Sequence, residues 1–335
     1  MNLVQSLREQ LQNTQKGKIK IVFPEGECMR ILSAVATTKD FDFLDAIVVG
    51  NRSKIQQLAT EAKLDLNGVQ IIDPQTFERL DFYAEVFSKR LKLPVGIVKA
   101  LFRNVNNFAA AMVGLDDADT LISGAITTTG EVLTSNKLLL GRDPDVNTVS
   151  ALVIVEDSKY KGPDGDVLAL SDPAINIDPS AEELADIAIS AAKTSKRILN
   201  WTPRTAFLSF STMGSACHPD VEKVSKAVKI AQSKNSSFIF DGEMQLDAAL
   251  SPRVAKTKVN RESDVAGKAN VLIFPDLNAG NIAIKLCQEL AGAKVYCSFI
   301  QGFRKTICDL SRGCTTENVV EMIILMAADI FNRRS

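Results

Sequence analysis

Small hydroxyl, glycine and charged residues gather at four places where a predicted β-strand gives way to a helix. These places are residues 24–27 with Arg30, residues 124–130, residues 209–215 and residues 301–314. In open α/β sheets, ligands bind beyond the carboxyl ends of the strands. The four strand exits are therefore the first candidates for a functional site.

The residue types at these exits favour an anionic ligand. Backbone N–H groups in turns and at helix N-termini attract phosphate, and the helix dipole adds to that attraction. Arg312 adds a planar guanidinium, which can clamp two phosphate oxygens at once. Any one exit could instead be an ordinary turn with a helix cap, and Arg312 could instead form a structural ion pair. The four exits together indicate a phosphate site, with these candidates in the third exit: Ser211, Thr212, Gly214 and Ser215.

Other reactive residue types give weaker signals. His218 is the only histidine, and its place before Pro219 is typical of the start of a surface helix. Asp241 and Glu243 follow a predicted strand and could bind a metal ion, but a turn whose carboxylates orient an arginine is the preferred interpretation. No Walker A motif and no G-x-G-x-x-G motif is present. We therefore expect no metal site, no nucleotide hydrolysis and no dinucleotide binding.

Short β-branched runs alternate with helical stretches through the first half of the chain. This alternation predicts an α/β fold with a parallel, doubly wound sheet. Strands are predicted at 18–23, 46–49, 69–72 and 120–123, and helices at 54–62, 76–91 and 95–113. A helix also follows the first strand, and another follows Gly130. A short amphipathic helix is predicted within residues 1–18.

A break at residues 141–145 precedes a second α/β alternation, which indicates two domains. The strand predicted at 149–155 is followed by a turn cluster at 162–166, as between hairpin strands. Ser180 and Glu183 form a capping-box pattern before a helix over 181–199. Further strands are predicted at 206–209, 238–240, 271–274 and 296–300, and further helices at 219–232, from 281 onward and at 316–331.

The chain has 335 residues, of which 46% are hydrophobic and 24% charged, and its net charge is −1. This balance gives no reason to expect a nucleic-acid or anionic-membrane partner. The most apolar stretch, residues 322–331, is too short to span a bilayer, and the N-terminal residues lack the apolar core of a signal peptide. The six cysteines have no C-x-x-C spacing, so we expect reduced thiols and a cytoplasmic location.

Several longer motifs occur in a recognisable order. They are FPEG at 23–26, PSAEELADI at 179–187, AFLSFSTMGS at 206–215, DGEMQLDAA at 241–249, GKANVLIFPDLNAGNI at 267–282 and DLSRGC at 309–314. With these motifs the chain resembles the phosphate acetyltransferase family, which includes the phosphate butyryltransferases. The likeness extends over essentially the whole chain and is densest between residues 170 and 316.

The resemblance implies a fold and an assembly. It implies two doubly wound α/β domains with a cleft between them, similar to the isocitrate and isopropylmalate dehydrogenases. The first domain would contain residues 1–147 and 302–335, and the second would contain residues 148–301. The resemblance also implies a homodimer with its active site in the cleft.

The resemblance further implies that acetyl phosphate and coenzyme A (CoA) are converted to acetyl-CoA and phosphate, reversibly and without a covalent acyl-enzyme. The CoA thiolate would attack the acyl carbonyl directly, so CoA is a substrate and no permanently bound cofactor is expected. Ser311 and Arg312 would act at the reacting centre, where the carbonyl oxygen gains charge and needs preorganised donors. The resemblance assigns substrate contacts to Thr127, Thr128, Thr129, Arg90 and Arg30.

The sequence departs from the family pattern at two functional positions. Thr134 stands where the family has an arginine that binds CoA, and Lys137 or Arg142 could substitute for it. Asn318 stands where the family has an aspartate proposed as the base for the CoA thiol. A neutral amide cannot take that role.

Without that base, we expect the thiol to lose its proton mainly to solvent, in the positive field of Arg312. Asp309 is an alternative base, although it could equally orient Arg312, and Glu317 is a second alternative. Two further functions remain open, namely a propionyl or butyryl phosphate transferase and a non-catalytic acyl-CoA-binding protein. The intact Ser311–Arg312 pair favours an enzyme.

Overall fold

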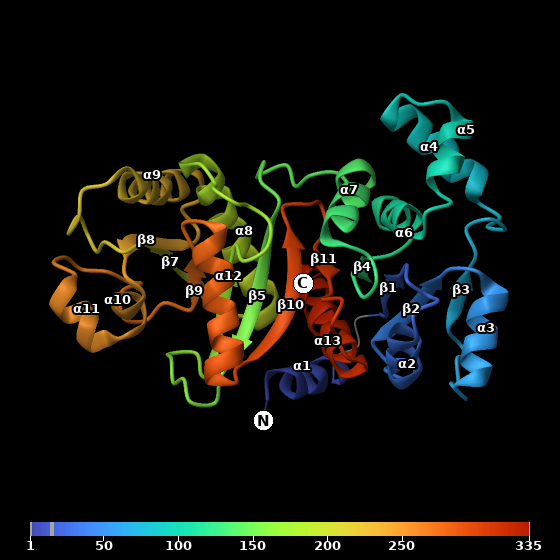
Figure 1. The fold of residues 1–335 in the computed structure, drawn as a ribbon, viewed down its shortest axis with the longest axis horizontal. Coiled ribbons are helices and arrows are strands. Elements are labelled where there is room, and N and C mark those ends of the chain that lie inside the picture. Colours follow the sequence, from blue (N-terminus) through green and yellow to red (C-terminus); the bar gives the residue numbers. More distant parts are fainter. Residues whose placement is uncertain (1, 14–16, 335) are drawn as a thin grey trace. The chain divides into compact units, whose positions relative to one another are not determined.

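The computed structural model describes residues 2–13 and 17–334. The chain divides into two compact units: unit 1 contains residues 1–142 and 303–335, and unit 2 contains residues 143–302 (Figure 1). Residues 14–16 of the predicted N-terminal segment lie outside the described residues. The remainder of that segment confirms the predicted amphipathic helix as α1 (Leu3–Gln12), which buries Val4, Leu7 and Leu11.

The described strands of unit 1 form a parallel sheet in the order β3, β2, β1, β4, β11. They are β1 (Ile19–Phe23), β2 (Leu44–Val49), β3 (Gln70–Ile72), β4 (Thr120–Ser123) and β11 (Ile307–Asp309). This confirms the predicted doubly wound arrangement, although β11 was not predicted. Because the strands are parallel, their carboxyl ends meet at one edge, where residues 24–27, 124–128 and 310–315 follow them.

Helices cover both faces of this sheet. In Figure 1, α6 and α7 lie above the strands of unit 1, and α2 and α13 lie below them. The helices are α2 (Met29–Thr38), α3 (Arg52–Glu61), α4 (Leu80–Leu91), α5 (Val95–Leu101), α6 (Val105–Gly114), α7 (Thr129–Leu139) and α13 (Thr316–Arg333). The core of unit 1 lies between these layers, where Ile21, Leu121 and Ile323 are fully buried or nearly so.

Two helix predictions in unit 1 were wrong in their extent. The stretch 95–113 holds two helices because the Asn104 side chain accepts the N–H groups of Asn106 and Asn107 and thereby starts α6. The helix predicted from residue 76 begins only at Leu80, after a turn in which Asp73 accepts the N–H group of Gln75. Short Asn and Asp side chains favour caps and turns because they bind nearby backbone groups.

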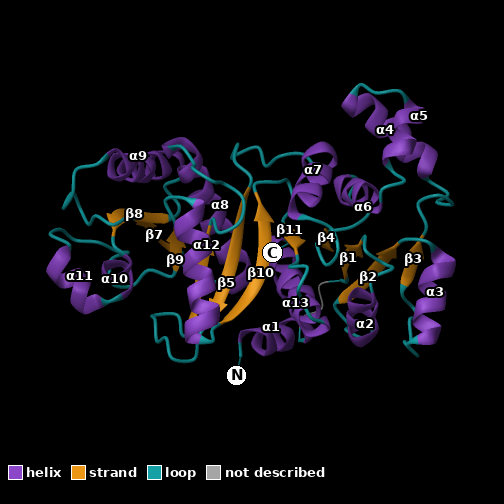
Figure 2. Cartoon of the chain, in the orientation of Figure 1, coloured by secondary structure: helices purple, strands orange, loops and turns teal. Residues whose placement is uncertain are grey.

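The strands of unit 2 lie in the order β10, β5, β6, β9, β7, β8, and they are drawn in orange in Figure 2. They are β5 (Ser150–Glu156), β6 (Val167–Ser171), β7 (Arg204–Leu208), β8 (Ile239–Met244), β9 (Val271–Ile273) and β10 (Lys294–Gln301). β5 runs antiparallel to β10 and to β6, and the other pairs are parallel. The turn cluster at 162–166 joins β5 to β6, which confirms the predicted hairpin.

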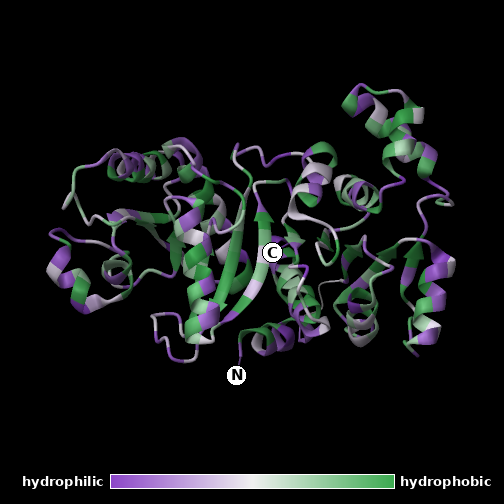
Figure 3. Ribbon diagram, viewed as in Figure 1, coloured by the Kyte–Doolittle hydropathy of each residue, from purple (hydrophilic) through white to green (hydrophobic). Residues whose placement is uncertain are grey.

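The helices of unit 2 are α8 (Ala181–Leu199), α9 (Pro219–Lys234), α10 (Leu246–Leu250), α11 (Pro252–Lys258) and α12 (Leu277–Leu286), and the short π-helix η1 (Cys287–Ala291) follows α12. Strand residues Val153, Leu170 and Leu272 form one core cluster with Ala248 of α10 and Ile284 of α12. Successive strand residues face opposite sides, and α8 packs on the opposite face of the same strands. Figure 3 accordingly colours most of β5 as hydrophobic.

The predicted capping box at the start of α8 is confirmed. Ser180 accepts the Glu183 N–H group through its hydroxyl, and the Glu183 carboxylate accepts the Ser180 N–H group. The helix predicted from residue 281 begins four residues earlier because the Asp276 side chain accepts the Ala279 N–H group. The short helices α10 and α11 were not predicted. Within residues 2–13 and 17–334, no helix combines the length and apolarity needed to cross a membrane.

Candidate active site

A buried carboxylate at the exit of β1 fixes the hydroxyl loop that follows β4. Glu25 is 3% exposed. It accepts the backbone N–H groups of Ala125, Ile126 and Thr127 at 2.8, 3.0 and 2.8 Å. Hydrogen bonds to an ionised acceptor are the stronger kind. These three N–H groups are therefore already engaged and are not available to an anionic ligand.

Arg30 of α2 binds backbone carbonyl groups of two loops. Its Nη1 donates to the carbonyl oxygens of Arg312 and Cys314, both at 2.8 Å. Its Nη2 donates to the carbonyl oxygen of Ala125 at 2.6 Å. A guanidinium offers five N–H donors in a fixed plane, which suits converging carbonyl groups. The arginine that was predicted to contact substrate thus makes these three bonds to the protein's own backbone.

A buried amide ties the same loop to the end of β4. Asn106 of α6 donates to Thr127 Oγ1 at 3.1 Å and accepts from Ser123 Oγ at 2.6 Å. The sequence prediction missed Asn106. In the sequence, Asn106 is simply a polar residue within a predicted helix, and nothing there shows that it is buried. In the structure it is 8% exposed.

The other two threonines of the loop have different partners. Thr128 begins α7 with a capping box, in which its side chain accepts the Glu131 N–H group and the Glu131 carboxylate accepts the Thr128 N–H group. Thr129 Oγ1 donates to Asp309 Oδ2 at 2.7 Å. Thr129 therefore links the loop after β4 to the last residue of β11.

Asp309 is a buried carboxyl group with one unpartnered oxygen. It is 6% exposed, and its Oδ1 has no hydrogen-bond partner among the described residues. Burial raises the pKa of Asp309 to about 6; the Thr129 hydroxyl opposes this shift and the Glu25 carboxylate adds to it. Gly124 permits the arrangement, because a Cβ there would lie 2.4 Å from Oδ1 and its φ of +100° favours glycine.

The turn between β11 and α13 presents donors that the described residues do not use. The backbone N–H groups of Ser311 and Arg312 have no acceptor there, and neither has the Arg312 guanidinium. Both residues are exposed, and the Ser311 hydroxyl accepts the Gly313 N–H group at 3.2 Å. The turn thus offers one cation and two N–H donors just ahead of the 18-residue helix α13. We call Glu25, Arg30, Asn106 and residues 123–129 and 309–312 the unit-1 cluster.

Asn318, where the family resemblance implies an aspartate, caps α13. Its side chain accepts the Thr315 N–H group at 3.1 Å, and Thr315 Oγ1 accepts the Asn318 N–H group at 3.2 Å. Its Nδ2 donates to Glu321 at 3.4 Å. These bonds give Asn318 a structural role at the start of the helix.

Two predicted CoA ligands lie on helices outside the unit-1 cluster. The Arg90 guanidinium lies 5.1 Å from the centre of the Phe87 ring and donates to the Gly114 carbonyl at 3.3 Å. Lys137 is exposed on α7 and forms no ion pair with the described residues. The contacts of these two side chains do not include Ser311 or Arg312.

In unit 2, the loop 209–215 closes on Glu243. Burial would raise the pKa of Glu243, but hydrogen bonds from the Gly214 N–H group and from the Ser211 and Ser225 hydroxyls outweigh it and lower the pKa. Four more N–H groups of the loop also have acceptors: Ser211 donates to Ser209, Thr212 to Ser215, Met213 to Glu243 and Ser215 to Thr212. An anion at this loop would compete with a carboxylate for the same donors.

Two further residues of unit 2 confirm their structural interpretations. The Asp241 carboxylate forms an ion pair with Arg261 and accepts the Ser263 hydroxyl, as expected of a carboxylate that orients an arginine, although Asp241 lies within β8 and not in the predicted turn. His218 Nδ1 accepts the Asp220 N–H group at 3.2 Å at the start of α9, as expected of a helix-start residue.

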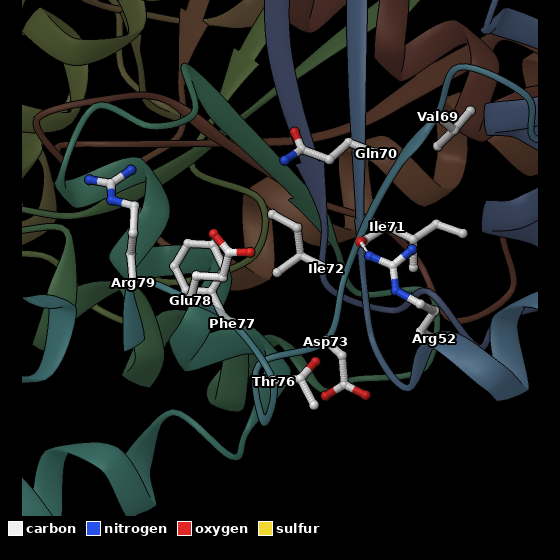
Figure 4. Close-up of a pocket in the computed structure, with 10 residues that line it drawn as sticks. All are labelled: Arg52, Val69, Gln70, Ile71, Ile72, Asp73, Thr76, Phe77, Glu78 and Arg79. Carbon is white, nitrogen blue, oxygen red and sulfur yellow. Dashed lines mark hydrogen bonds between the residues drawn. The ribbon is translucent and has the colours of Figure 1, made fainter. Parts of the chain in front are cut away.

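The pocket in Figure 4 lies at the end of β3 and includes no member of the unit-1 cluster. Its volume is about 440 Å³, and it is lined by Arg52 and residues 69–73 and 76–79. Arg52 donates to the Ile71 carbonyl inside this pocket, and Arg79 pairs with Asp117. Because both arginines already have partners, the unit-1 cluster is the stronger candidate for acyl chemistry.

Comparison with known proteins gives a consistent result. A family model described as "Phosphate acetyl/butaryl transferase" matches residues 3–327. The phosphate acetyltransferase of Clostridium acetobutylicum is 38% identical over 330 residues, covering 97% of this chain and 97% of the relative. That of Thermoanaerobacterium thermosaccharolyticum is 39% identical over 330 residues, covering 98% and 99%. The solved EutD phosphotransacetylase from Staphylococcus aureus has a TM-score of 0.90 at 35% identity and covers 98% of both chains. The chain therefore belongs to the phosphate acetyl/butaryl transferase family, as its motifs implied.

Proposed function

We propose that this protein transfers an acetyl group between phosphate and CoA, by direct attack of the CoA thiolate on acetyl phosphate. Family membership and the names of the relatives support this proposal. The observation that carries it is the turn at Ser311 and Arg312, whose guanidinium and two N–H groups have no acceptor among the described residues. Acetyl phosphate presents the anionic and carbonyl oxygens that such donors bind.

Arg312 and its turn would stabilise the charge that develops during transfer. As the thiolate adds to the carbonyl carbon, negative charge builds on the carbonyl oxygen and then on the departing phosphate. Preorganised donors aimed at that charge lower the barrier because they need no reorganisation during the reaction. Arg30 supports this role, since it holds the Arg312 carbonyl at 2.8 Å and so fixes the turn. Ser311 is proposed to place its N–H group and hydroxyl at the same centre.

CoA is proposed as a substrate rather than a resident cofactor. The threonine loop 127–129 is proposed to contact it, together with Arg90 and with Lys137, which is free of ion pairs within the described part of the chain. Of the phosphate ligands proposed for unit 2, the Ser211 hydroxyl and the Gly214 N–H group bind Glu243 in this structure. The proposal for phosphate binding therefore rests mainly on Arg312.

We also propose that the protein is a cytoplasmic homodimer whose two units act as its two domains. The six cysteines are present as thiols and not as disulfides, which suits a reducing compartment. Exposed apolar residues recur every four positions along α12 and η1, namely Ile282, Leu286 and Leu290, which are 56%, 50% and 79% exposed. Such a row is typical of a surface that another chain covers. A second copy of this chain is the proposed partner.

The test is an assay of purified protein with CoA and acetyl, propionyl or butyryl phosphate, in which thioester formation is followed. We expect the largest kcat/KM with acetyl phosphate. A larger kcat/KM with butyryl phosphate would show that butyryl, and not acetyl, is the preferred acyl group. The family description includes both acyl groups. Binding of CoA without any acyl transfer would instead indicate a non-catalytic acyl-CoA-binding protein.

A further inference from the structure

Thr129 and Asp309 form a hydrogen-bonded pair in the unit-1 cluster that leaves one buried carboxyl oxygen without a partner among the described residues. The hydroxyl of Thr129 donates to Asp309 Oδ2, whereas Oδ1 is buried without a partner among the described residues. Buried polar atoms are nearly always paired, so an unpaired carboxylate oxygen calls for a reason. Retaining a carboxylate there, where it is only 6% exposed, is costly.

Asp309 differs from the other carboxylates near the hydroxyl loop in its capacity to take a proton. Glu25 is occupied by three backbone N–H groups. Glu131 is occupied by the N–H group and hydroxyl of Thr128. Asp309 accepts one hydroxyl, and burial raises its pKa to about 6. A base with a pKa slightly below the working pH combines the ionised form with useful proton affinity.

The charged groups around this pair are few. The Glu25 carboxylate is close enough to act on the charge of Asp309. The Arg30 guanidinium binds the backbone carbonyl of Arg312, which follows Asp309 by three positions. The facing elements α6 and α7 contribute the neutral side chains of Asn106 and Thr129. Asp309 is deeply buried and Thr129 is only half-buried, so the Thr129 hydroxyl is the more accessible member of the pair.

We propose that Thr129 and Asp309 form a proton relay for the CoA thiol, an inference that rests on the proposed function. As sulfur bonds to the acetyl carbon, the thiol proton passes to Thr129 Oγ1, and the Thr129 proton passes to Asp309 Oδ2. The carbon–oxygen bond to phosphate breaks and phosphate leaves with that electron pair. Asp309 then returns its proton through Thr129 to the departing phosphate or to water, which restores the pair. Asp309 acts in this way without touching the substrate.

The experiment measures kcat/KM for CoA from pH 5 to 9 with saturating acetyl phosphate. We expect the wild-type value to rise through pH 6 and then to level off. Thr129→Val and Asp309→Asn should lower that plateau on the order of 100-fold. In both variants kcat/KM for CoA should climb about tenfold per pH unit until the pH approaches the thiol pKa, near 8.5. Thr129→Ser, which keeps the hydroxyl, should restore the plateau to within about threefold.

A double variant tests whether the two residues act as one unit. Thr129→Val combined with Asp309→Asn should be no slower than the slower single variant, because either change breaks the same relay. Equal pH profiles for wild type and Thr129→Val, or fully multiplicative losses in the double variant, would overturn the relay. A wild-type protein without acetyl transfer would instead overturn the proposed function. Thermal melting of each variant separates loss of the relay from loss of the fold.

Discussion

At the scale of single residues, the Arg312 guanidinium is exposed and has no acceptor among the described residues. If it stabilises the transferring group, Arg312→Ala should lower kcat/KM by about 2–4 kcal/mol, the loss typical of one oxyanion donor. Arg312→Lys should recover little, because an ammonium cannot reproduce a planar fork. Steady-state kinetics with acetyl phosphate and CoA provide the measurement.

A matched control for that prediction is Arg253→Ala. Arg253 is also exposed, but it lies on α11 in unit 2, and its loss should leave kcat/KM within about twofold. Near-normal turnover of Arg312→Lys would contradict the proposed role, since a point charge would then be sufficient.

Asp309 should reduce the stability of the folded protein at neutral pH. Its folded pKa of about 6 lies above its ordinary value of 3.8. Between those two pH values the folded state binds more protons than the unfolded state, so stability falls as pH rises through this window. Asp309→Asn has no charge to bury and should be more stable than wild type at pH 8, by about 1–3 kcal/mol. That advantage should shrink toward pH 4, where both side chains are neutral.

Denaturant unfolding at pH 4.5 and pH 8 measures this difference. The Asn variant keeps an acceptor for the Thr129 hydroxyl, so the comparison isolates the charge. An equal stability difference at both pH values would show that Asp309 titrates at its ordinary pKa in the folded state.

Loss of the Lys137 charge should change KM for CoA and leave KM for acetyl phosphate nearly unchanged. It is exposed on α7 and has no ion pair with any described residue, so its charge is available to a CoA phosphate. Lys137→Ala should raise KM for CoA about three- to tenfold, with the effect shrinking at high salt. KM for acetyl phosphate should stay nearly constant. A change confined to acetyl phosphate would mean that the two subsites are assigned the wrong way round.

At the scale of elements, one short segment after β1 holds two loops in place. Glu25 binds the N–H groups of the loop after β4, and Arg30 binds carbonyl groups of that loop and of the turn after β11. In this way a carboxylate satisfies donors and a guanidinium satisfies acceptors. The cluster's geometry therefore depends on how α2 starts as well as on the loops themselves.

Glu25→Gln tests this dependence. An amide has one acceptor oxygen, and its NH₂ group would face backbone donors, so buried N–H groups lose their partner. We expect a loss of about 2–4 kcal/mol in unfolding free energy and a fall in kcat larger than the change in KM for CoA. Glu27→Gln is the control, because Glu27 pairs with Lys54 near the surface and such pairs contribute about 0–1 kcal/mol. Equal effects of the two variants would contradict the proposed role of Glu25.

At the scale of the whole molecule, the apolar row on α12 and η1 is the surface through which the proposed homodimer would form. Charged residues placed in a buried apolar interface are strongly unfavourable. Leu286→Glu combined with Leu290→Glu should therefore convert a dimer to monomers, measured by sedimentation velocity. Phe82→Glu is the control, because Phe82 is 49% exposed on α4 in unit 1. A wild-type monomer, or a dimer that survives the double change but not Phe82→Glu, would rule out this surface.

The sequence by itself determined the family, the α/β alternation and the features that depend on neighbours along the chain. The Ser180–Glu183 capping box lies within four residues, and its partners meet whenever the helix forms. The predicted start at residue 76 was four residues too early, and the observed start at Leu80 has no side-chain cap. The helix predicted over 95–113 missed the break before Val105 because an Asn side chain can either cap a helix or face solvent inside one. The sequence pattern does not distinguish these outcomes.

Only the tertiary structure decided what surrounds the candidate reacting residues. Glu25 meets Ala125 across 100 positions, Thr129 meets Asp309 across 180 and Arg30 meets Arg312 across 282. No local pattern encodes contacts between residues so far apart in the sequence. These contacts arise from the order in which parallel strands assemble and bring their carboxyl ends to one edge. The raised pKa of Asp309 has the same origin, since burial depends on all the elements that pack around a side chain.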